Sequence, residues 1–376
     1  MKSKYKFSEL IEEISEQNTE LKYGLDDIVG VTIEKGLIPT IANLQQTALN
    51  KFYIVKPDTF VYNPRTHGVR LGMGFNKTNY TYITSWNNIA FKVKDDALRI
   101  LNPEYLWLYF NRSEWDRETN YHAWGSSTIV FSWNTFLNLE IQIPEKSYQD
   151  NLVRQYNAIK RRIALKQQIN DNLASTLNEL YKKYFTADNI NELPVGWRIV
   201  PFSDIATIVM GQSPEGEYCN NEQIGEPLLN GPTEFGTYSP KPVQWTTDGK
   251  KYCNEGDILF CVRGSTTGRM NWADQSYVIG RGLAAIRHKS NTSLNWYVKA
   301  ILDNHLRDIL SAATGSTFPN VGKELLNEFK VIIPDESTLS MFSEKGAQLS
   351  CLIASNSKEI DKIEMLKELL LYRLSY

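Results

Sequence analysis

The 376-residue sequence lacks the spacings that mark common metal sites and targeting segments. Its four cysteines form no CxxC pair, and its four histidines form no HxxxH or HExxH pattern, so a metal site is not expected. No run of about 18 apolar residues is present, which argues against a membrane span. The N-terminus also lacks the apolar region of a signal peptide. These absences together predict a cytoplasmic protein with free thiols.

Familiar catalytic motifs are absent as well. Asn63-Pro64-Arg65-Thr66 is only superficially like the Asn-Pro-Pro-aromatic motif of amino-methyltransferases, because the second proline and the aromatic residue are missing. The stretch LGMGF at 71–75 lacks the Gly-Lys-Ser/Thr ending of a phosphate-binding loop, and no GxSxG elbow surrounds Ser265. We therefore predict no catalysis, no metal and no cofactor in this chain.

The charge balance is nearly neutral, but the basic residues are unevenly distributed. The net charge is −2, whereas residues 51–99 carry eight Lys and Arg against three acids, and residues 241–289 carry eight against four. Two local basic centres could each face a phosphate backbone. A scatter of solvated surface charges would produce the same counts, so charge alone leaves both interpretations open.

An internal repeat organises the chain. A shift of 190 residues superimposes Gly125-Ser126 on Gly315-Ser316 and Ile143-Pro144 on Ile333-Pro334. Upstream, FSELI at 7–11 echoes FSDIA at 202–206, and DTFVYNPR at 58–65 echoes DILFCVRG at 257–264. The changing offsets indicate that the globular parts of the two halves have diverged by insertion. The predicted order is globular unit, long helix, globular unit, long helix.

Each long helix carries an apolar seam with heptad spacing, and the two seams keep the 190-residue shift throughout. The apolar seam positions that we predict are Leu152, Ile159, Ile163, Leu173 and Leu180 in the first helix, and Leu349, Ile353, Ile360, Ile363 and Leu370 in the second. Polar residues at mid-seam, Lys166, Asn170 and Asn356, could fix the register. Ser147 and Asp150 predict a capping box at the first helix start.

A helix with such a seam needs a partner, and the other helix of the same chain is the nearest candidate. If they pair, we expect antiparallel helices and a pseudo-twofold internal repeat. The alternative is that each helix only clasps its own globular unit. The globular units themselves read as mixed α and β, with strands predicted at 51–64 and 256–264 and helices at 102–120 and 293–313.

The loops between these elements suit nucleic-acid reading. Arginine can bind guanine with two hydrogen bonds, asparagine can do the same with adenine, and small residues let a backbone come close to DNA. For each residue, an ordinary loop or surface role remains the alternative. The candidate DNA-contacting residues are Arg65, Arg70, Asn76, Lys77, Asn79 and Tyr80 in the first half, and Arg263, Ser265, Thr266, Thr267, Arg269, Arg281 and Ser316 in the second.

This layout resembles the specificity subunit of type I restriction-modification enzymes. The resemblance is carried by LPVGWRIVPFSDIATIVMGQSP at 193–214, by GDILFCVRGSTTGRM with IGRGLAAI within 256–286, and by GSTFPNVGKELLNEFKVIIP at 315–334. The first half is less similar, because it lacks the Leu-Pro-x-Gly-Trp opening and the Arg-Gly loop. The resemblance implies an α+β fold with two mixed α/β target-recognition domains separated by two long antiparallel coiled-coil helices.

It also implies domains at 1–145 and 187–335, with spacer helices at 146–186 and 336–376. In that family each domain reads half of a split double-stranded DNA site, and the helices dock two methyltransferase subunits. S-adenosylmethionine and ATP are then expected on the methyltransferase and restriction subunits. Two alternatives stay open: a scaffold that binds proteins but no DNA, and the related type IIB-like setting, in which a similar subunit serves an enzyme that both cuts and methylates.

Overall fold

The computed structural model describes residues 2–40, 48–66, 70–125, 129–185, 193–237, 239–315 and 319–375. The chain divides into two compact units. Unit 1 consists of Met1–Arg162 with Ile363–Tyr376, and unit 2 consists of Ile163–Lys362. None of the helices in the described ranges is both long and apolar enough to cross a membrane.

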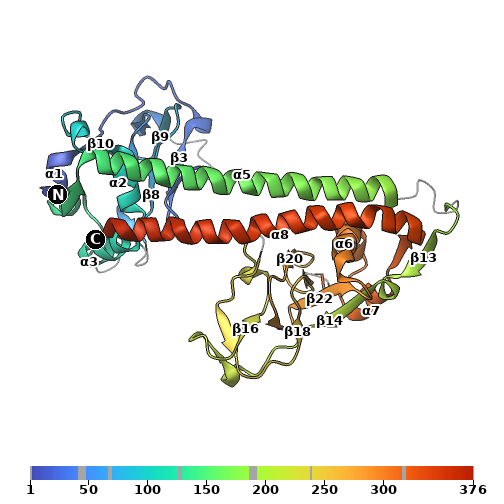
Figure 1. The fold of residues 1–376 in the computed structure, drawn as a ribbon. Helices are drawn as coiled ribbons and strands as arrows, with labels where there is room; N and C mark the ends of the chain where they lie inside the picture. The colour runs from blue at the N-terminus through green and yellow to red at the C-terminus, as the bar shows by residue number, and fades with distance from the viewer. Residues whose placement is uncertain are drawn as a thin grey trace. The chain divides into compact units, whose positions relative to one another are not determined.

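A small antiparallel sheet forms the centre of unit 1 and packs against short helices (Figure 1). Its strands, in spatial order, are β2 (Ile11–Glu13), β10 (Ile89–Val93), β6 (Phe60–Tyr62) and β8 (Met73–Phe75). The helices are α1 (Phe7–Leu10), α2 (Pro103–Phe110), α3 (Ser113–His122) and α4 (Trp133–Asn138). The core between them is unusually aromatic, with Phe7, Phe60, Phe91, Phe110 and Trp115 all buried.

Short strand pairs surround this centre. One is a hairpin, β3 (Val29–Thr32) with β4 (Gly36–Pro39), and another pairs β5 (Tyr53–Val55) with β9 (Tyr82–Thr84), which are far apart in the chain. The others are β1 (Lys2–Lys6) with β12 (Glu140–Pro144), and β7 (Arg65–Thr66) with β11 (Ile129–Val130). β12 is the strand that ends at Ile143-Pro144 and leads into the first long helix.

Unit 2 repeats the central sheet strand for strand. Its spatial order is β14 (Ala206–Met210), β22 (Leu283–His288), β19 (Ile258–Cys261) and β20 (Met270–Trp272). β13 (Arg198–Pro201) pairs with the exit strand β23 (Lys330–Ile333), just as β1 pairs with β12. Phe202 donates its backbone N–H to the Phe329 carbonyl at 2.8 Å, and Phe7 donates to Leu139 at 3.0 Å. The predicted internal repeat is therefore present in the hydrogen bonding.

What differs in unit 2 is the material added to that sheet. A second, five-stranded sheet has the spatial order β15 (Cys219–Asn220), β17 (Gln244–Thr246), β16 (Glu226–Leu229), β21 (Tyr277–Ile279) and β18 (Tyr252–Cys253). The helices of this unit, besides the long ones, are α6 (Asn295–Ser311) and α7 (Lys323–Glu328).

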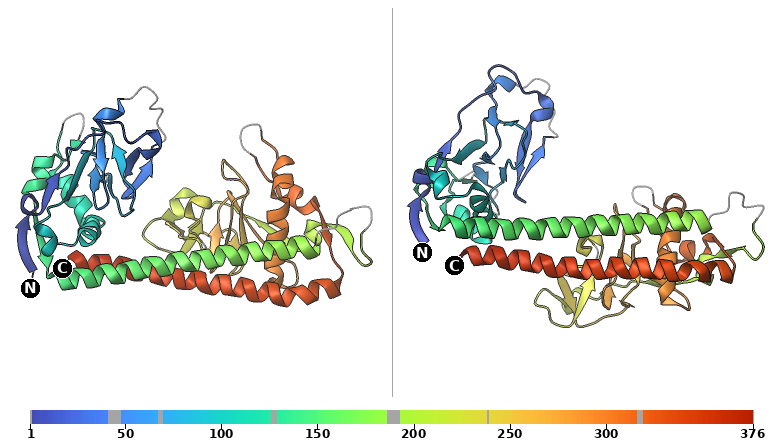
Figure 2. Two further views of the ribbon diagram at one scale, coloured as in Figure 1. Left: turned by 90° about the horizontal axis from the view of Figure 1, so that it is seen from above. Right: turned by 45° about the horizontal axis from the view of Figure 1, so that its top comes forward.

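The two long helices predicted from the sequence are α5 (Lys146–Phe185) and α8 (Glu336–Tyr372). In unit 2 their parts lie side by side and antiparallel, as Figures 1 and 2 show. Lys166 contacts Asn356 near one end of this pairing, and Tyr184 stacks on Phe342 near the other, with ring centroids 3.8 Å apart. In unit 1, Leu152 and Val153 of α5 share the core with Leu371 and Leu374 from the end of the chain.

The seam follows the heptad spacing. Every apolar seam position named above is buried or half-buried, whereas Leu165, Ile169, Leu352 and Leu366, which lie off the seam, are about half exposed. At mid-seam, the Lys166 amine donates to Asn356 Oδ1 at 2.8 Å and pairs with Glu359 at 2.7 Å. Buried Asn170 donates to Ser357 Oγ at 3.2 Å. These polar groups satisfy one another across the pair, as expected of a register-fixing layer.

Some local predictions need correction. The predicted strand 51–64 is two strands, β5 and β6, separated by a turn in which Asp58 has a φ of 61°. The predicted helix 102–120 is broken at Arg112, whose backbone is extended and whose guanidinium donates to the Leu374 carbonyl at 3.2 Å. The predicted capping box is wrong because α5 already begins at Lys146, and Asp150 instead accepts hydrogen bonds from Lys146 and Asn102.

Candidate nucleic-acid interface

In unit 2, the loop that follows β19 holds five of the candidate residues in a tightly bonded turn. Gly264 and Gly268 both have left-handed backbones, with φ of 92° and 89°, which explains why glycine stands at these positions. The Thr267 hydroxyl lies 2.7 Å from the Gly264 carbonyl and 2.9 Å from the Pro319 carbonyl, so its role is to hold the loop. Ser265 and Thr266 are exposed.

The arginines of this loop point outward from a fixed backbone. Arg263 forms an antiparallel bridge with Asn320, and Val321 donates to the Val262 carbonyl at 2.9 Å. The Arg269 carbonyl accepts from the Cys261 N–H at 2.9 Å, which closes the turn back onto β19. Both arginine side chains are exposed and join no ion pair within the described ranges.

Arg281 is held in place by a different local arrangement, a close backbone packing on both of its neighbours. It lies between Gly280 and Gly282, and a Cβ on either glycine would come within 2.5 Å of Asn230. The Arg281 N–H donates to Ser213 Oγ at 3.2 Å, while the side chain is exposed. A close approach of two backbones therefore fixes the position from which this arginine projects. Ser316 lies outside the described residues.

In unit 1 some of the candidate side chains are exposed, and others already make hydrogen bonds or ion pairs within the unit. Arg65, Asn79 and Tyr80 are exposed, and Tyr80 is 73% exposed, a high value for a large aromatic side chain. Asn76, in contrast, is buried, and its amide donates to the carbonyls of Val55 and Tyr80 at 3.1 and 2.8 Å. The predicted base-reading role of Asn76 does not fit this placement, because its hydrogen bonds already hold the loop together.

The basic residues of unit 1 are more neutralised than their number suggests. Lys77 pairs with Glu104 at 2.8 Å, Arg70 lies 3.7 Å from Asp116, and Lys56 pairs with Glu16 at 2.6 Å. Burial would raise the pKa of Glu104, but hydrogen bonds from Lys77 and Asn157 outweigh it and the pKa is lowered. The excess of positive charge counted along residues 51–99 is thus largely balanced by acids from elsewhere in the unit.

One positive cluster was missed by sequence reasoning. Burial lowers the pKa of Lys160, and the nearby charges of Lys77 and Lys367 lower it further, against the opposing effect of Glu104. Lys160 lies on α5 and Lys367 on α8, 207 positions along the chain from it, so only the pairing of the helices brings these amines together. The heptad seam was the signal that could have located them.

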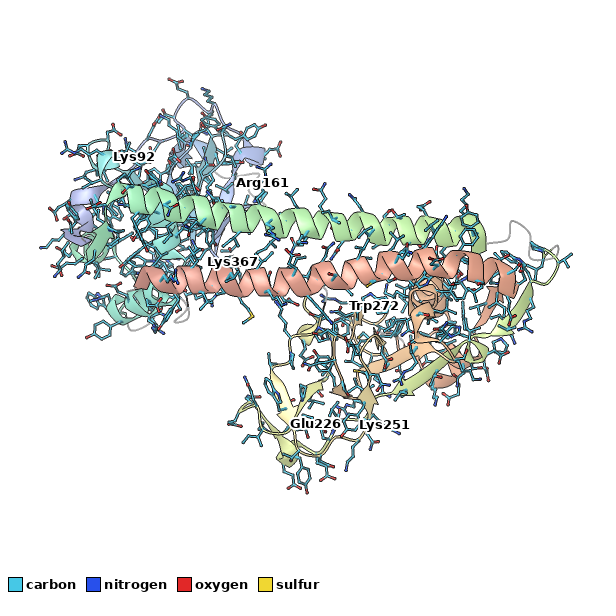
Figure 3. All side chains as sticks on the ribbon, in the orientation of Figure 1. Lys92, Arg161, Glu226, Lys251, Trp272 and Lys367 are labelled. Atoms are coloured by element: carbon cyan, nitrogen blue, oxygen red, sulfur yellow. The ribbon has the colours of Figure 1, made fainter. Side chains whose placement is uncertain are left out.

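Glu226 is an example of a charged side chain outside the candidate loops. Figure 3 draws the side chains and labels Glu226 on β16, Lys251 directly before β18, and Trp272 on β20. The Glu226 carboxylate accepts from the Tyr252 hydroxyl at 2.8 Å, a surface contact within that sheet. Over the described ranges, His, Cys, Asp and Glu side chains do not gather in threes that could hold a metal ion.

The comparison with known families agrees with this arrangement. Residues 194–349, which lie within unit 2, match the family described as "Type I restriction modification DNA specificity domain". The resemblance seen in the sequence is therefore confirmed, and this part of the chain is similar to the specificity subunits of type I restriction enzymes.

Two proteins of Methanocaldococcus jannaschii are similar to this chain. One, named as the specificity subunit of the type I restriction enzyme MjaX, is 31% identical over 188 residues, which are 50% of this chain and 44% of that protein. The other, the MjaIX specificity subunit, is 22% identical over 294 residues, covering 73% of this chain and 68% of that protein. The chain thus spans less than half the length of the first relative.

A solved structure has the same fold. The crystal structure of a type I restriction-modification system S subunit from M. genitalium aligns over 100% of this chain and 96% of that one, with a TM-score of 0.58 and 14% sequence identity. At this identity the likeness concerns the fold, which is α+β with two long helices.

Proposed function

We propose that this chain is the DNA sequence-specificity subunit of a type I restriction-modification complex. The observation that carries the proposal is the repeated four-stranded sheet, which in each unit ends in a loop with an exposed arginine. Two copies of one reading scaffold in one chain suit a DNA site with two separate halves. The target-recognition domains in this proposal are residues 1–145 and 187–335.

The long helices have two roles in the proposal. They form the spacer between the half-sites, as residues 146–186 and 336–376, and they dock two methyltransferase subunits. The chain itself carries no catalysis; S-adenosylmethionine and ATP bind to the methyltransferase and restriction subunits. Its place is the cytoplasm, where the DNA and these partners are.

The decisive experiment is a map of methylated adenines in the source genome, with this chain present and after its gene is deleted. We expect a two-part sequence motif whose methylation disappears in the deletion strain and returns when the gene is restored. An unchanged map would contradict the proposal. A chain that binds methyltransferase subunits but gives no salt-dependent DNA binding in the assembled complex would be a protein scaffold instead.

Two single substitutions test whether the loop of unit 2 contacts DNA. Arg263→Ala and Arg269→Ala change the loop of unit 2 only, so we expect both to weaken binding while the response to changes in the first half-site stays unaltered. A loss that depends on the second half-site marks a base contact, and an equal loss on every sequence marks a phosphate contact. The measurement is the affinity of the assembled complex for duplexes in which one half-site at a time is scrambled. Unchanged affinity in both variants would remove this loop from the interface.

A further inference from the structure

Arg65 and Arg263 occupy the same place in the two copies of the sheet. The echo of FSELI and FSDIA makes Ile11 the counterpart of Ala206, so their strand partners Val93 and His288 correspond, and so do Phe91 and Ile286, two residues earlier. Phe91 of β10 faces Phe60 of β6, and Ile286 of β22 faces Ile258 of β19, so Phe60 and Ile258 are equivalent. Counting five residues from each brings the chain to Arg65 and to Arg263. The sequence echo of DTFVYNPR and DILFCVRG was one residue out of register, because it paired Arg65 with Gly264.

The neighbouring backbone repeats the same bonds. Phe131 donates to the carbonyl before Arg65 at 2.8 Å, and Val321 donates to the carbonyl before Arg263 at 2.9 Å. Arg65 faces Val130, which bridges back to Trp124. Arg263 in the same way faces Asn320, which bridges back to Thr314. Each arginine therefore projects from a main chain that is clamped on both sides.

Other equivalent positions at this end of the two sheets carry different side chains in the two units. The Asn63 N–H donates to the Gly72 carbonyl at 2.9 Å, as Cys261 does to Arg269, so the counterpart of Arg269 is a glycine. Lys77 follows β8 by two residues, and Asp274 follows the equivalent strand β20 by two, so the charge is reversed there. Against these differences, an exposed arginine outside any ion pair of the described residues recurs at 65 and 263.

We infer that Arg65 and Arg263 are equivalent phosphate anchors, which seat each unit on the DNA backbone, while side chains without a counterpart, such as Arg269, distinguish the bases. This inference rests on the proposed function. Two half-sites of different sequence have the sugar-phosphate backbone in common and differ in their bases. A side chain kept at one clamped position in both reading units fits the shared part of the ligand, and side chains that differ fit the part that differs.

The test uses the full chain assembled with its methyltransferase subunits. Affinity is measured over a range of salt concentrations for two duplexes of equal length, one carrying the methylated motif and one unselected. For Arg65→Ala and for Arg263→Ala we expect the salt slope to fall by about 0.9 on both duplexes, because one phosphate contact is lost. The preference for the motif over the unselected duplex should stay the same, and the double variant should lose about twice the slope.

Two control substitutions separate anchoring from base reading. Arg65→Lys should keep the slope and the preference, because a lysine still pairs with phosphate as a point charge. Arg269→Ala should reduce the preference for the motif, because a base contact contributes to one sequence only. Melting curves of all variants check that the exposed substitutions leave the fold intact.

The outcomes are distinguishable. If the wild-type complex binds duplexes without any salt dependence, the proposed function fails, and the anchors fail with it. If the wild type binds as expected but the alanine variants keep the full slope, only the anchor assignment is overturned. Loss of discrimination at a single base pair in Arg65→Ala or Arg65→Lys would make these arginines base readers instead.

Discussion

Units 1 and 2 each contain a four-stranded sheet with the same strand order, and they differ in the strands added around it. In unit 1 the addition is the β3–β4 hairpin, whose turn residue Lys35 reaches Asp116 of α3 at 2.6 Å. In unit 2 the addition is a complete five-stranded sheet. The comparison shows that the sheet and its arginine keep the same place in both units, while the strands added around them differ. Predictions at three sites probe this contrast, beginning with the largest expected effect.

The Lys35–Asp116 pair should be the strongest single tie that unit 1 has and unit 2 lacks. Its side chains are only 6% and 13% exposed. Asp116→Asn leaves the Lys35 amine buried without its carboxylate, so we expect a loss of about 3–5 kcal/mol in the free energy of unfolding. The measurement is chemical denaturation, with hydrogen exchange used to locate the loss in unit 1.

The same pair predicts a pH dependence. Burial lowers the pKa of Lys35 below its usual 10.5, although Asp116 opposes the shift. Between the lowered value and 10.5 the unfolded chain binds more protons than the folded one, so this group's contribution to stability rises with pH in that window. The double variant Lys35→Met, Asp116→Leu should recover most of the lost stability and remove this dependence. Equal damage in the double and single variants would contradict the assignment.

The two long helices carry very different residues at one equivalent seam position, Gly346 in α8. Its counterpart in α5 is Tyr156, but in α8 the ring of Trp296 lies so close that a Cβ would stand 2.1 Å from it. We expect Gly346→Ala to cost about 1–3 kcal/mol through overpacking, despite a gain of about 1 kcal/mol in helix propensity. The readout is the denaturation midpoint, together with hydrogen exchange in α6.

A second substitution tests the cause. In a Trp296→Ala background the ring is gone, so Gly346→Ala should become neutral or stabilising. If alanine at 346 is as harmful without the ring as with it, the close approach of Trp296 is not the reason for glycine.

The helix starts give the smallest expected effect. Asp335, the counterpart of Glu145, precedes α8 and accepts from the N–H groups of Ser337 and Thr338, both at 3.0 Å. Hydrogen bonds from the Ser337 and Thr338 hydroxyls lower the pKa of Asp335 below its usual 3.8. Because the folded pKa is depressed, the cap stabilises the protein above 3.8 and this contribution is lost as the pH falls below that value.

Asp335→Asn is the matched control, since asparagine also caps helices but does not titrate there. We expect the variant to match the wild type at neutral pH and to lose less stability during an acid titration followed by circular dichroism. Identical acid curves for the two proteins would show that the Asp335 carboxylate contributes nothing to acid sensitivity.

Structure could be predicted from the sequence where the spacing of apolar residues follows a single period. It could not be predicted where a contact distant in the chain determines the local backbone. The seam of α5 and α8 could be placed residue by residue, because each helix buries one stripe. The break at Arg112 could not, since it depends on a contact with Leu374, far along the chain. The turn at Asp58 was signalled by Pro57-Asp58 but was hidden by the apolar residues on both sides.

The candidate interface shows the same division. The glycine-rich loop of unit 2 was visible in the sequence because its left-handed turns demand glycine. The counterpart in unit 1 was not recognised, because Arg65 is followed by Thr66 and its equivalence lies in strand register. Asn76 was misjudged because an exposed and a buried asparagine look alike in a loop, and only the carbonyls of Val55 and Tyr80 reveal the difference.

The contact between Lys166 and Asn356 has a consequence for how such a chain can change over time. The two residues are 190 positions apart, the period of the repeat, so each touches its own counterpart. An insertion in one helix alone would change the register of the α5–α8 seam contacts on one side of the Lys166–Asn356 contact. The seam contacts on the other side would keep their register. Loops can be exchanged one at a time, but the two helices can lengthen or shorten only together.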